Sequence, residues 1–358
     1  ELANLIGNIN AGGGGVNRNL VINGAMNVAQ RSTSVSSVTS GGYKALDRYQ
    51  VDYSGSHAWT ISQDSNTPNG FAASMKFLCT TAQALTGSQR IAFRQKIEGH
   101  NLQSTKKGTS DAESVTASFH VKSNKTGTYI LEYFDIDNQR HINKAYTVDT
   151  ANTWEYKTIT FEADTTGTFD NDANASAQLH FWLGAGSTYT SGTLQSSWGS
   201  SVTANRAVGN VNLADTVNNY WQITGIQLEV GQNPTTFEHE PFERTLEKCR
   251  RYYFVLADGS ADSNEQIGNQ YGFSTAQSEG IVRWGEMRAS PSLKHPTGSN
   301  YYAISSSGDT TTFDNMLTYK FTQRSGLLYK TGLSITHGRG YRFFINNASA
   351  YVHLDAEL

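Results

Sequence analysis

Hydrophobic and polar residues alternate with a period of two along most of the chain. The clearest case is the stretch 175–185, where the apolar positions are Ala177, Leu179, Phe181 and Leu183 and the intervening positions are Gln178, His180 and Trp182. Because successive side chains of a β-strand point to opposite faces, this pattern predicts a strand with one face in a core. Similar stretches occur at 73–77, 91–97, 115–121, 129–136, 154–161 and 220–230. Their spacing predicts an all-β protein built on a jelly-roll β-sandwich.

One stretch, 241–250, has helical spacing instead, with Phe242, Leu246 and Cys249 on one side of the helix. Strand-like patterns resume beyond it and continue to residue 352. We therefore expect a jelly-roll β-sandwich at 19–240, a linking helix at 241–251 and a second, smaller β-sandwich domain at 252–358.

The first 18 residues have a different pattern. Leu2, Leu5 and Ile9 form a short stripe typical of helices that pack against copies of themselves, and four glycines follow at 12–15. We expect 1–18 to be the end of a stalk and a glycine-rich hinge. The stripe, together with the low charge of the chain, predicts a homotrimer.

Composition narrows the possible partners. Only 16% of the 358 residues are charged, against about 25% in an average globular protein, and the net charge is −3. Nucleic acids and anionic membranes attract concentrated Lys and Arg, so neither is expected as a partner. No apolar run approaches the roughly 18 residues of a membrane-spanning helix, so no membrane insertion is expected. Cys79 and Cys249 have no zinc-motif spacing and are expected to be buried thiols.

Several stretches resemble the tail-fibre and virion structural proteins of tailed bacteriophages. The most specific is 223–253, with the segments Ile223-Thr224-Gly225-Ile226-Gln227-Leu228-Glu229-Val230-Gly231 and Cys249-Arg250-Arg251-Tyr252-Tyr253. Shorter pieces at 19–26, 118–123, 152–156 and 354–358 resemble the same proteins. The resemblance is good over about 17–253 and weak over the rest.

The resemblance implies a homotrimeric fibre or appendage component of a virion, with a jelly roll similar to carbohydrate-binding modules. Such a protein is assembled with other virion proteins in the cytoplasm of the host bacterium. It would bind a host-surface glycan through many shallow sites, although the resemblance names no particular sugar. Two alternatives stay open: a purely structural fibre or connector protein, and a polysaccharide hydrolase.

The strand alternation itself indicates a binding surface. If Phe181 faces the interior, then Gln178, His180 and Trp182 lie on the opposite face, and His120 likewise points away from the core. An exposed indole can pack on the C–H face of a sugar ring while short polar groups bind the hydroxyls. The alternative is that a loop or another subunit covers this face and Trp182 is an interface residue.

Further candidates for glycan contact are Tyr189, Trp198, Tyr301 and Tyr302. The first two stand in a loop rich in Ser, Thr and Gly, and the last two lie in a turn-rich stretch, which is the composition of many recognition loops. Docking or ordinary surface positions are the alternative for these residues. Trp154, in contrast, opens a predicted strand and is expected to lie in the core.

Two local features carry structural expectations. Asp170, Asp172 and Asn174 form an oxygen-rich loop of the kind that calcium prefers, with a solvated turn as the alternative. No other cofactor is expected. Gly225 interrupts the alternation of 223–230 and predicts a β-bulge.

Catalysis is not expected. Glu132, Asp135 and Asp137 lie on one predicted strand, and strand parity separates Glu132 from the other two. A glycosidase needs two acids facing each other across a cleft, and no HExxH, GxSxG or P-loop motif occurs in the sequence. We therefore expect a binding protein rather than an enzyme.

Overall fold

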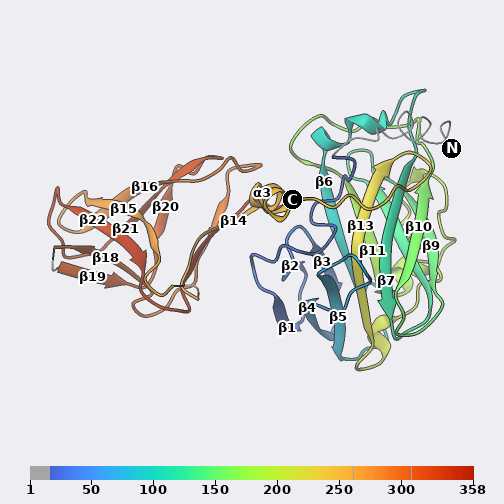
Figure 1. Cartoon of the computed structure of the whole chain (residues 1–358), viewed down its shortest axis with the longest axis horizontal. Helices are drawn as coiled ribbons and strands as arrows, with labels where there is room; N and C mark the ends of the chain where they lie inside the picture. The colour runs from blue at the N-terminus through green and yellow to red at the C-terminus, as the bar shows by residue number, and fades with distance from the viewer. Residues whose placement is uncertain (1–16, 261, 308) are drawn as a thin grey trace. The chain divides into compact units, whose positions relative to one another are not determined.

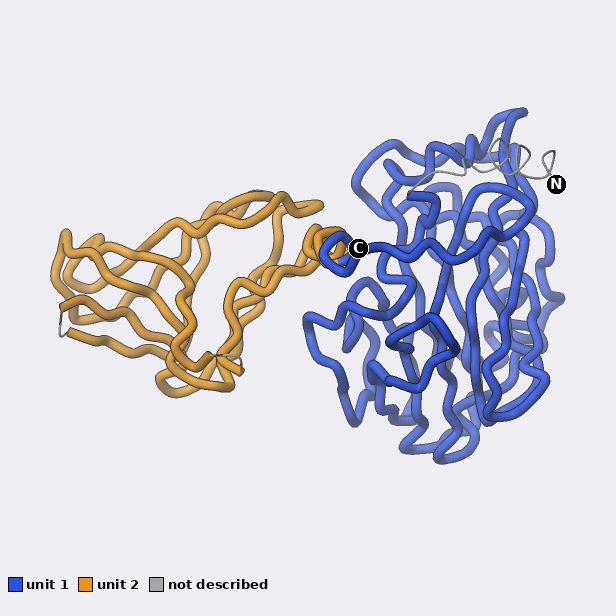
Figure 2. Tube along the Cα trace, in the orientation of Figure 1, with its two compact units in different colours: residues 1–245, 358 blue, residues 246–357 orange. Residues whose placement is uncertain are grey.

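The computed structural model describes residues 17–358 except 261 and 308 (Figure 1). The chain divides into two compact units, residues 1–245 with Leu358 (unit 1) and residues 246–357 (unit 2) (Figure 2). Antiparallel strands make up most of the regular structure in both units, which confirms the all-β prediction. The predicted stalk stripe of Leu2, Leu5 and Ile9 and the hinge glycines lie outside the described residues.

Unit 1 is a sandwich of two sheets with jelly-roll character. The first sheet has six strands in the order β1 (Ser34–Val38), β4 (Ala58–Asp64), β5 (Ser74–Thr81), β13 (Tyr220–Val230), β7 (Val115–Ser123) and β10 (Glu155–Phe161). The second has seven in the order β12 (Gly199–Ser200), β9 (Arg140–Val148), β8 (Gly127–Asp135), β11 (Ala175–Ala185), β6 (Arg90–Glu98), β3 (Gln50–Ser54) and β2 (Gly42–Tyr43). Each sheet therefore brings together strands that are distant in sequence.

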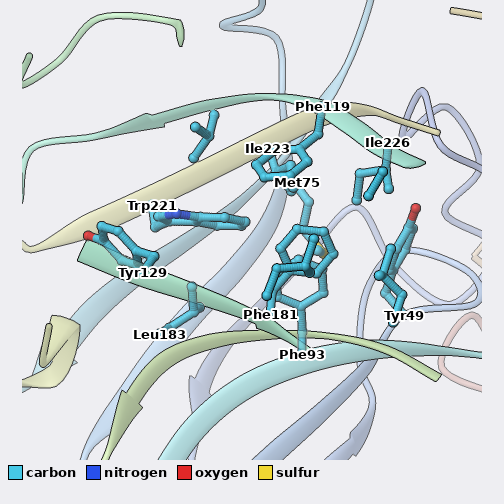
Figure 3. Packing of buried hydrophobic residues seen from close by; sticks show 14 of the residues in the cluster. Tyr49, Met75, Phe93, Phe119, Tyr129, Phe181, Leu183, Trp221, Ile223 and Ile226 are labelled. Atoms are coloured by element: carbon cyan, nitrogen blue, oxygen red, sulfur yellow. The ribbon is translucent and has the colours of Figure 1, made fainter. Parts of the chain in front are cut away.

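Aromatic side chains from both sheets meet in the core of unit 1 (Figure 3). Phe93 of β6 stacks on Phe181 of β11 with ring centroids 4.7 Å apart, and Phe119 of β7 meets Phe181 edge-on at 5.2 Å. Trp221 of β13 lies 5.3 Å from Phe93. Burying a large apolar side chain stabilises a fold by about 1.5–3 kcal/mol, so this cluster holds the two sheets together.

Strand β10 forms an edge of the six-stranded sheet. Tyr156 and Thr158 point outward and are exposed. Lys157 points to the other side, where its Nζ lies 2.6 Å from a carboxylate oxygen of Glu155 and 3.0 Å from one of Asp149. Charged groups on an edge strand disfavour the addition of strands from other molecules.

Short helices lie among the strands of unit 1, and one helix spans the boundary between the units. They are η1 (Gly99–Asn101), η2 (Gln103–Thr105), α2 (Ser187–Thr190), η3 (Thr203–Asn205), η4 (Leu213–Asp215) and α3 (Phe242–Arg250). The division between the units falls after Thr245, inside α3, where the sequence predicts a linking helix over 241–251. None of the helices in the described ranges is long and apolar enough to cross a membrane.

Unit 2 has its own core between two sheets. The smaller sheet has the order β14 (Tyr253–Asp258), β23 (Tyr351–Asp355) and β17 (Ser292–Lys294). The larger has the order β19 (Asp309–Phe313), β18 (Tyr302–Ser306), β22 (Gly340–Ile345), β15 (Gln266–Gly272), β16 (Gln277–Arg283), β21 (Ser325–Thr331) and β20 (Leu317–Tyr319). Tyr302, Leu328, Phe343 and Val352 are buried between them.

Both cysteines are buried, as the sequence predicts. Cys79 lies on β5 and Cys249 on α3. Burial, reinforced by the negative charge of Asp215, raises the pKa of the Cys79 thiol to about 11. A thiol with so high a pKa is a poor nucleophile at neutral pH because little of it is ionised.

Candidate functional site

The side chains of β11 point in the directions that the sequence predicts, but the face that was expected to be exposed is buried. Gln178, His180 and Trp182 lie on the face of the seven-stranded sheet opposite to Phe181, as alternation requires, but all three are buried. Trp182 is 0% exposed. Its ring centroid lies 4.6 Å from that of His180, on which it stacks, and 5.1 Å from that of Tyr189. A buried indole has no face available for a sugar ring, so the expected platform is absent here.

The covering comes from the segment after β11, which includes α2 and η3. Tyr189 of α2 and Ala207 join Trp182, Ala92 and Ile130 in a second apolar cluster outside the sheet. The loop that was expected to expose Tyr189 thus buries it over Trp182. The alternative in which a loop covers this face is the arrangement that the structure has.

A charged network lies beneath this loop. Glu132 of β8 is fully buried and accepts hydrogen bonds from Arg206 Nε and Nη2, both at 2.7 Å. His141 Nδ1 lies 2.9 Å from Glu132, and Trp182 Nε1 donates to it at 3.3 Å. Burial acts to raise the pKa of Glu132, but the charge of Arg206 and the hydrogen bonds from His141 and Arg206 outweigh it and lower the pKa well below its usual range. Glu132 is therefore an ionised anchor for the loop and is poorly suited to donate a proton.

His180 lies in the same network. Its Nδ1 is 3.4 Å from Glu132 and its Nε2 is 3.9 Å from Asp52 of β3. Burial is the largest influence and, despite the two carboxylates, lowers the pKa of His180 to about 3. The imidazole is consequently neutral at physiological pH and acts as a flat partner for Trp182.

Aromatic side chains are exposed on the other sheet instead. His120 of β7 lies 5.0 Å from Tyr156 of β10 and 5.3 Å from Phe71, and Phe71 in turn lies 5.0 Å from Phe237 and 5.2 Å from His239. We call these five residues the aromatic row. Tyr156 is 51% exposed, His239 is exposed, and the other three are half-buried. The row lies on the outer face of the six-stranded sheet.

The strand register explains two members of the row. Tyr156 is paired directly with His120 across β10 and β7, so both side chains point away from the core. The outward direction predicted for His120 is thus confirmed. Burial lowers the pKa of His120, so its ring is neutral at neutral pH. Trp154, which the sequence placed in the core, is instead half-buried, and its Nε1 donates to Asn66 Oδ1 at 3.0 Å.

A β-bulge positions Phe71. The pairing of β13 with β7 shifts between Thr224 and Gln227, which confirms the bulge predicted at Gly225. Gly225 has φ +65°, and a Cβ there would lie 2.6 Å from the ring of Phe71. Only glycine therefore lets the Phe71 ring rest on the sheet beside His120 without strain.

The segment that carries Phe237 and His239 is fixed by Glu238 between them. Its carboxylate accepts hydrogen bonds from the backbone N–H of Arg18 at 2.7 Å and of Asn19 at 3.0 Å. Burial opposes ionisation of Glu238, but these backbone donors lower its pKa overall. The aromatic row is thus positioned by strands β7 and β10 at one end and, at the other end, by the segment that Glu238 fixes.

The remaining predicted contacts are scattered. Trp198 is half-buried, donates from Nε1 to the Glu162 carbonyl at 2.7 Å and lies 5.0 Å from Lys107 Nζ. Tyr302 is buried, contrary to the exposure that a glycan contact requires, and Tyr301 is half-buried beside it. Trp198 belongs to unit 1, like His120, whereas Tyr301 and Tyr302 belong to unit 2.

In the loop predicted to bind calcium, some of the oxygen atoms accept hydrogen bonds from the loop itself. The Asp172 carboxylate accepts from the backbone N–H of Asn174 at 2.9 Å and from its side-chain amide at 2.6 Å, while the Asp170 N–H donates to Asp137 at 2.9 Å. Over the described ranges no group of three or more His, Cys, Asp or Glu side chains could hold a metal ion. Calcium binding at Asp170, Asp172 and Asn174 stays a prediction.

A shallow depression of about 400 Å³ lies near η2. It is lined by Leu102, Gln103, Thr105, Lys106, Lys107, Thr109, Asp111, Thr168 and Phe169. Lys107 is held by Asp135 at 2.5 Å and Asp164 at 3.0 Å, and Phe169 is only 8% exposed. The depression therefore offers polar groups but no open aromatic face, unlike the aromatic row.

No protein-family model and no curated protein matches the sequence. Similar solved structures include the enzymatically active domain of tailspike protein 4 from bacteriophage CBA120, with 13% identity and a TM-score of 0.32 over 60% of this chain and 21% of that one. The family 11 carbohydrate-binding module of Clostridium thermocellum with a mixed-linked tetrasaccharide has 11% identity and a TM-score of 0.29 over 57% of this chain and 99% of the module. The CBM22-1 xylan-binding domain of Paenibacillus barcinonensis has 9% identity and a TM-score of 0.27, covering 60% and 96%. At such scores nothing about ligand or assembly follows for this chain.

Proposed function

We propose that this chain is a non-enzymatic glycan-binding component of a bacteriophage fibre or appendage. It works as a homotrimer in the virion, is assembled with other virion proteins in the host cytoplasm, and binds a glycan of the host surface. The resemblance of 223–253 to phage fibre proteins supports the fibre part of this proposal. The half-exposed Tyr156 ring within the aromatic row carries the glycan part.

The chemistry of the row fits a sugar. A tyrosine ring on an outward sheet face can pack on the C–H face of a sugar, and its hydroxyl can bind water or a sugar hydroxyl. Thr158 is exposed two residues along the same strand, and Lys122 and Trp154 both donate to Asn66 nearby. The polar groups beside the rings are the neutral Thr158 and Asn66 and the single charge of Lys122. With so little charge, the surface suits an uncharged polysaccharide that lies along it.

Shallow sites of this kind are weak individually. A single site with a dissociation constant near 1 mM contributes about 4 kcal/mol. Three linked copies on one fibre, repeated on several fibres, raise the effective affinity by orders of magnitude. Attachment of a particle thus needs many copies of a modest site.

Tyr156→Ala tests the site directly. We expect binding to the best ligand of a neutral glycan array, measured with the full chain, to weaken at least about tenfold, or ~1.4 kcal/mol. Phe242→Ala is the matched control, because Phe242 is 49% exposed but lies outside the row. Equal binding by both variants, or no binding of the parent chain to any glycan or host cell, would refute the proposal.

The hydrogen bonds and ion pairs of two buried carboxylates support the proposal that this chain is not an enzyme. The Glu132 carboxylate is hydrogen-bonded to Arg206 and His141. The Asp135 carboxylate forms an ion pair with Lys107 and accepts a hydrogen bond from the Asn138 N–H. We expect incubation with host polysaccharide to release no new reducing ends. Release that is lost in Asp135→Ala would establish the hydrolase alternative instead.

A further inference from the structure

Unit 2 exposes a continuous apolar face on the outer side of its larger sheet. We call it the β16 face, and its members are Tyr271, Ile281, Leu317, Tyr319, Leu327 and Tyr329. Ile281 is 62% exposed and Tyr319 is 56% exposed, while Leu327 and Tyr329 are half-buried. Exposed apolar side chains that gather on one face usually mark an interaction site.

The strand register shows that these residues are neighbours. Ile281 of β16 is paired with Leu327 of β21, and Leu327 is paired with Tyr319 of β20. Tyr329 is likewise paired with Leu317. Because paired residues point to the same side of a sheet, the members form one surface across four adjacent strands.

The chemistry of the β16 face differs from that of the aromatic row. Ile281, at its centre, has the largest exposed fraction among the large hydrophobic side chains of the described residues. A protruding aliphatic side chain gives a sugar ring no flat surface to stack on and no hydrogen bond. Burial against an apolar protein surface, in contrast, gains free energy in proportion to the area removed from water.

Two charges flank the centre of this face. Glu279 and Arg283 lie two residues before and after Ile281 on β16, so all three side chains point to the same side. Tyr271 Oη donates to Glu279 at 2.6 Å, and Gln277 Nε2 donates to it at 3.0 Å, which fixes the carboxylate in place. The backbone of Arg283 pairs with Ser325 of β21, but among the described residues its guanidinium has no hydrogen-bonding or ion-pair partner.

We propose that the β16 face packs against the same face of a second copy of this chain. With Ile281 near the symmetry axis and the two β16 strands crossing in opposite directions, Glu279 of one copy meets Arg283 of the other. In a trimer, where no two copies are related by a two-fold axis, the charges meet head to tail instead: Glu279 of each copy faces Arg283 of the next, with Ile281 of all three copies near the three-fold axis. The face is thus complementary to itself in both its apolar centre and its charges, and the proposal is independent of glycan binding by unit 1.

Ile281→Asp is the first test, made on the full chain by sedimentation or light scattering over a range of concentrations. The parent chain is expected to be oligomeric, and the variant to dissociate at concentrations at least tenfold higher than the parent. Val217→Asp is the control, because Val217 is 47% exposed but lies in unit 1. A parent chain that is monomeric throughout, or an Ile281→Asp variant with the parent's mass, overturns the proposal.

Charge reversal tests the pairing itself. Glu279→Arg alone and Arg283→Glu alone should each weaken self-association, because each places like charges opposite one another. The double variant Glu279→Arg/Arg283→Glu should recover it, since the charges are then merely exchanged. Failure of the double variant to associate better than either single variant overturns the pairing. Binding of the glycan measured through Tyr156 should be the same per copy in all of these variants.

Discussion

Arg206 illustrates how one residue can hold a whole loop in place. It neutralises the buried Glu132, and its guanidinium lies 5.2 Å from the ring of Trp182 and 5.1 Å from that of Phe134. Removing one partner of a buried ion pair leaves the other charge without compensation. The sequence around Arg206 gives no sign of this role, because its partners are more than 20 positions away in the chain.

Arg206→Ala is therefore expected to lower the free energy of unfolding by about 3–5 kcal/mol. Denaturant titration followed by tryptophan fluorescence measures this, since the Trp182 ring is in contact with the Arg206 guanidinium. Lys106→Ala serves as a contrast, because the Lys106–Glu113 ion pair is exposed and should contribute little. Similar losses in the two variants would contradict the role of Arg206.

His180 makes the stability depend on pH. In the unfolded chain its pKa is near 6.5, whereas burial lowers it to about 3 in the folded protein. Between these values the unfolded state binds the proton and the folded state does not, so stability falls as the pH falls. The maximal slope from this one residue is about 1.4 kcal/mol per pH unit.

Between about pH 6.5 and 5.5 the dependence comes mainly from histidines, because carboxylates titrate at lower pH, and comparison with His180→Gln separates the share of His180. We expect the free energy of unfolding of the parent chain to drop across this range, and His180→Gln to flatten the dependence. A variant with the parent's slope would show that other buried histidines, such as His57, are responsible instead.

At the scale of elements, the bulge in β13 connects the backbone to the aromatic row. Gly225→Ala should cost about 1–2 kcal/mol from its left-handed conformation alone and should also displace Phe71. In the background of Phe71→Ala the clash with the Phe71 ring disappears and only the closer approach to His120 Nδ1, at 3.2 Å, is left, so the two substitutions should be less than additive in a double-mutant cycle. Full additivity in thermal or denaturant unfolding would contradict the contact.

Periodicity predicts strands far better than it predicts what covers them. The parity of β11 and the bulge at Gly225 follow from the local sequence, because side-chain direction in a strand is fixed by the backbone. Whether Trp182 meets solvent depends on the loop that carries Tyr189, and that loop folds according to distant partners such as Glu132. His120 was found by parity, whereas Phe71 and Phe237 have no strand pattern and join the row only through tertiary packing.

At the scale of the whole molecule, each unit has a core of its own. We expect calorimetry to show two transitions, with Phe181→Ala lowering the stability of one and Phe343→Ala that of the other, each by about 3–5 kcal/mol. A single transition that both variants shift equally would show that the units unfold together.

The burial of both cysteines has a practical consequence. Neither thiol should react quickly with maleimides while the protein is folded, because Cys79 is largely protonated and Cys249 is shielded from solvent. A single cysteine introduced at an exposed position such as Thr126 would then take up a fluorophore selectively. Binding of the labelled protein to host cells could then be imaged one molecule at a time, without first replacing either native cysteine.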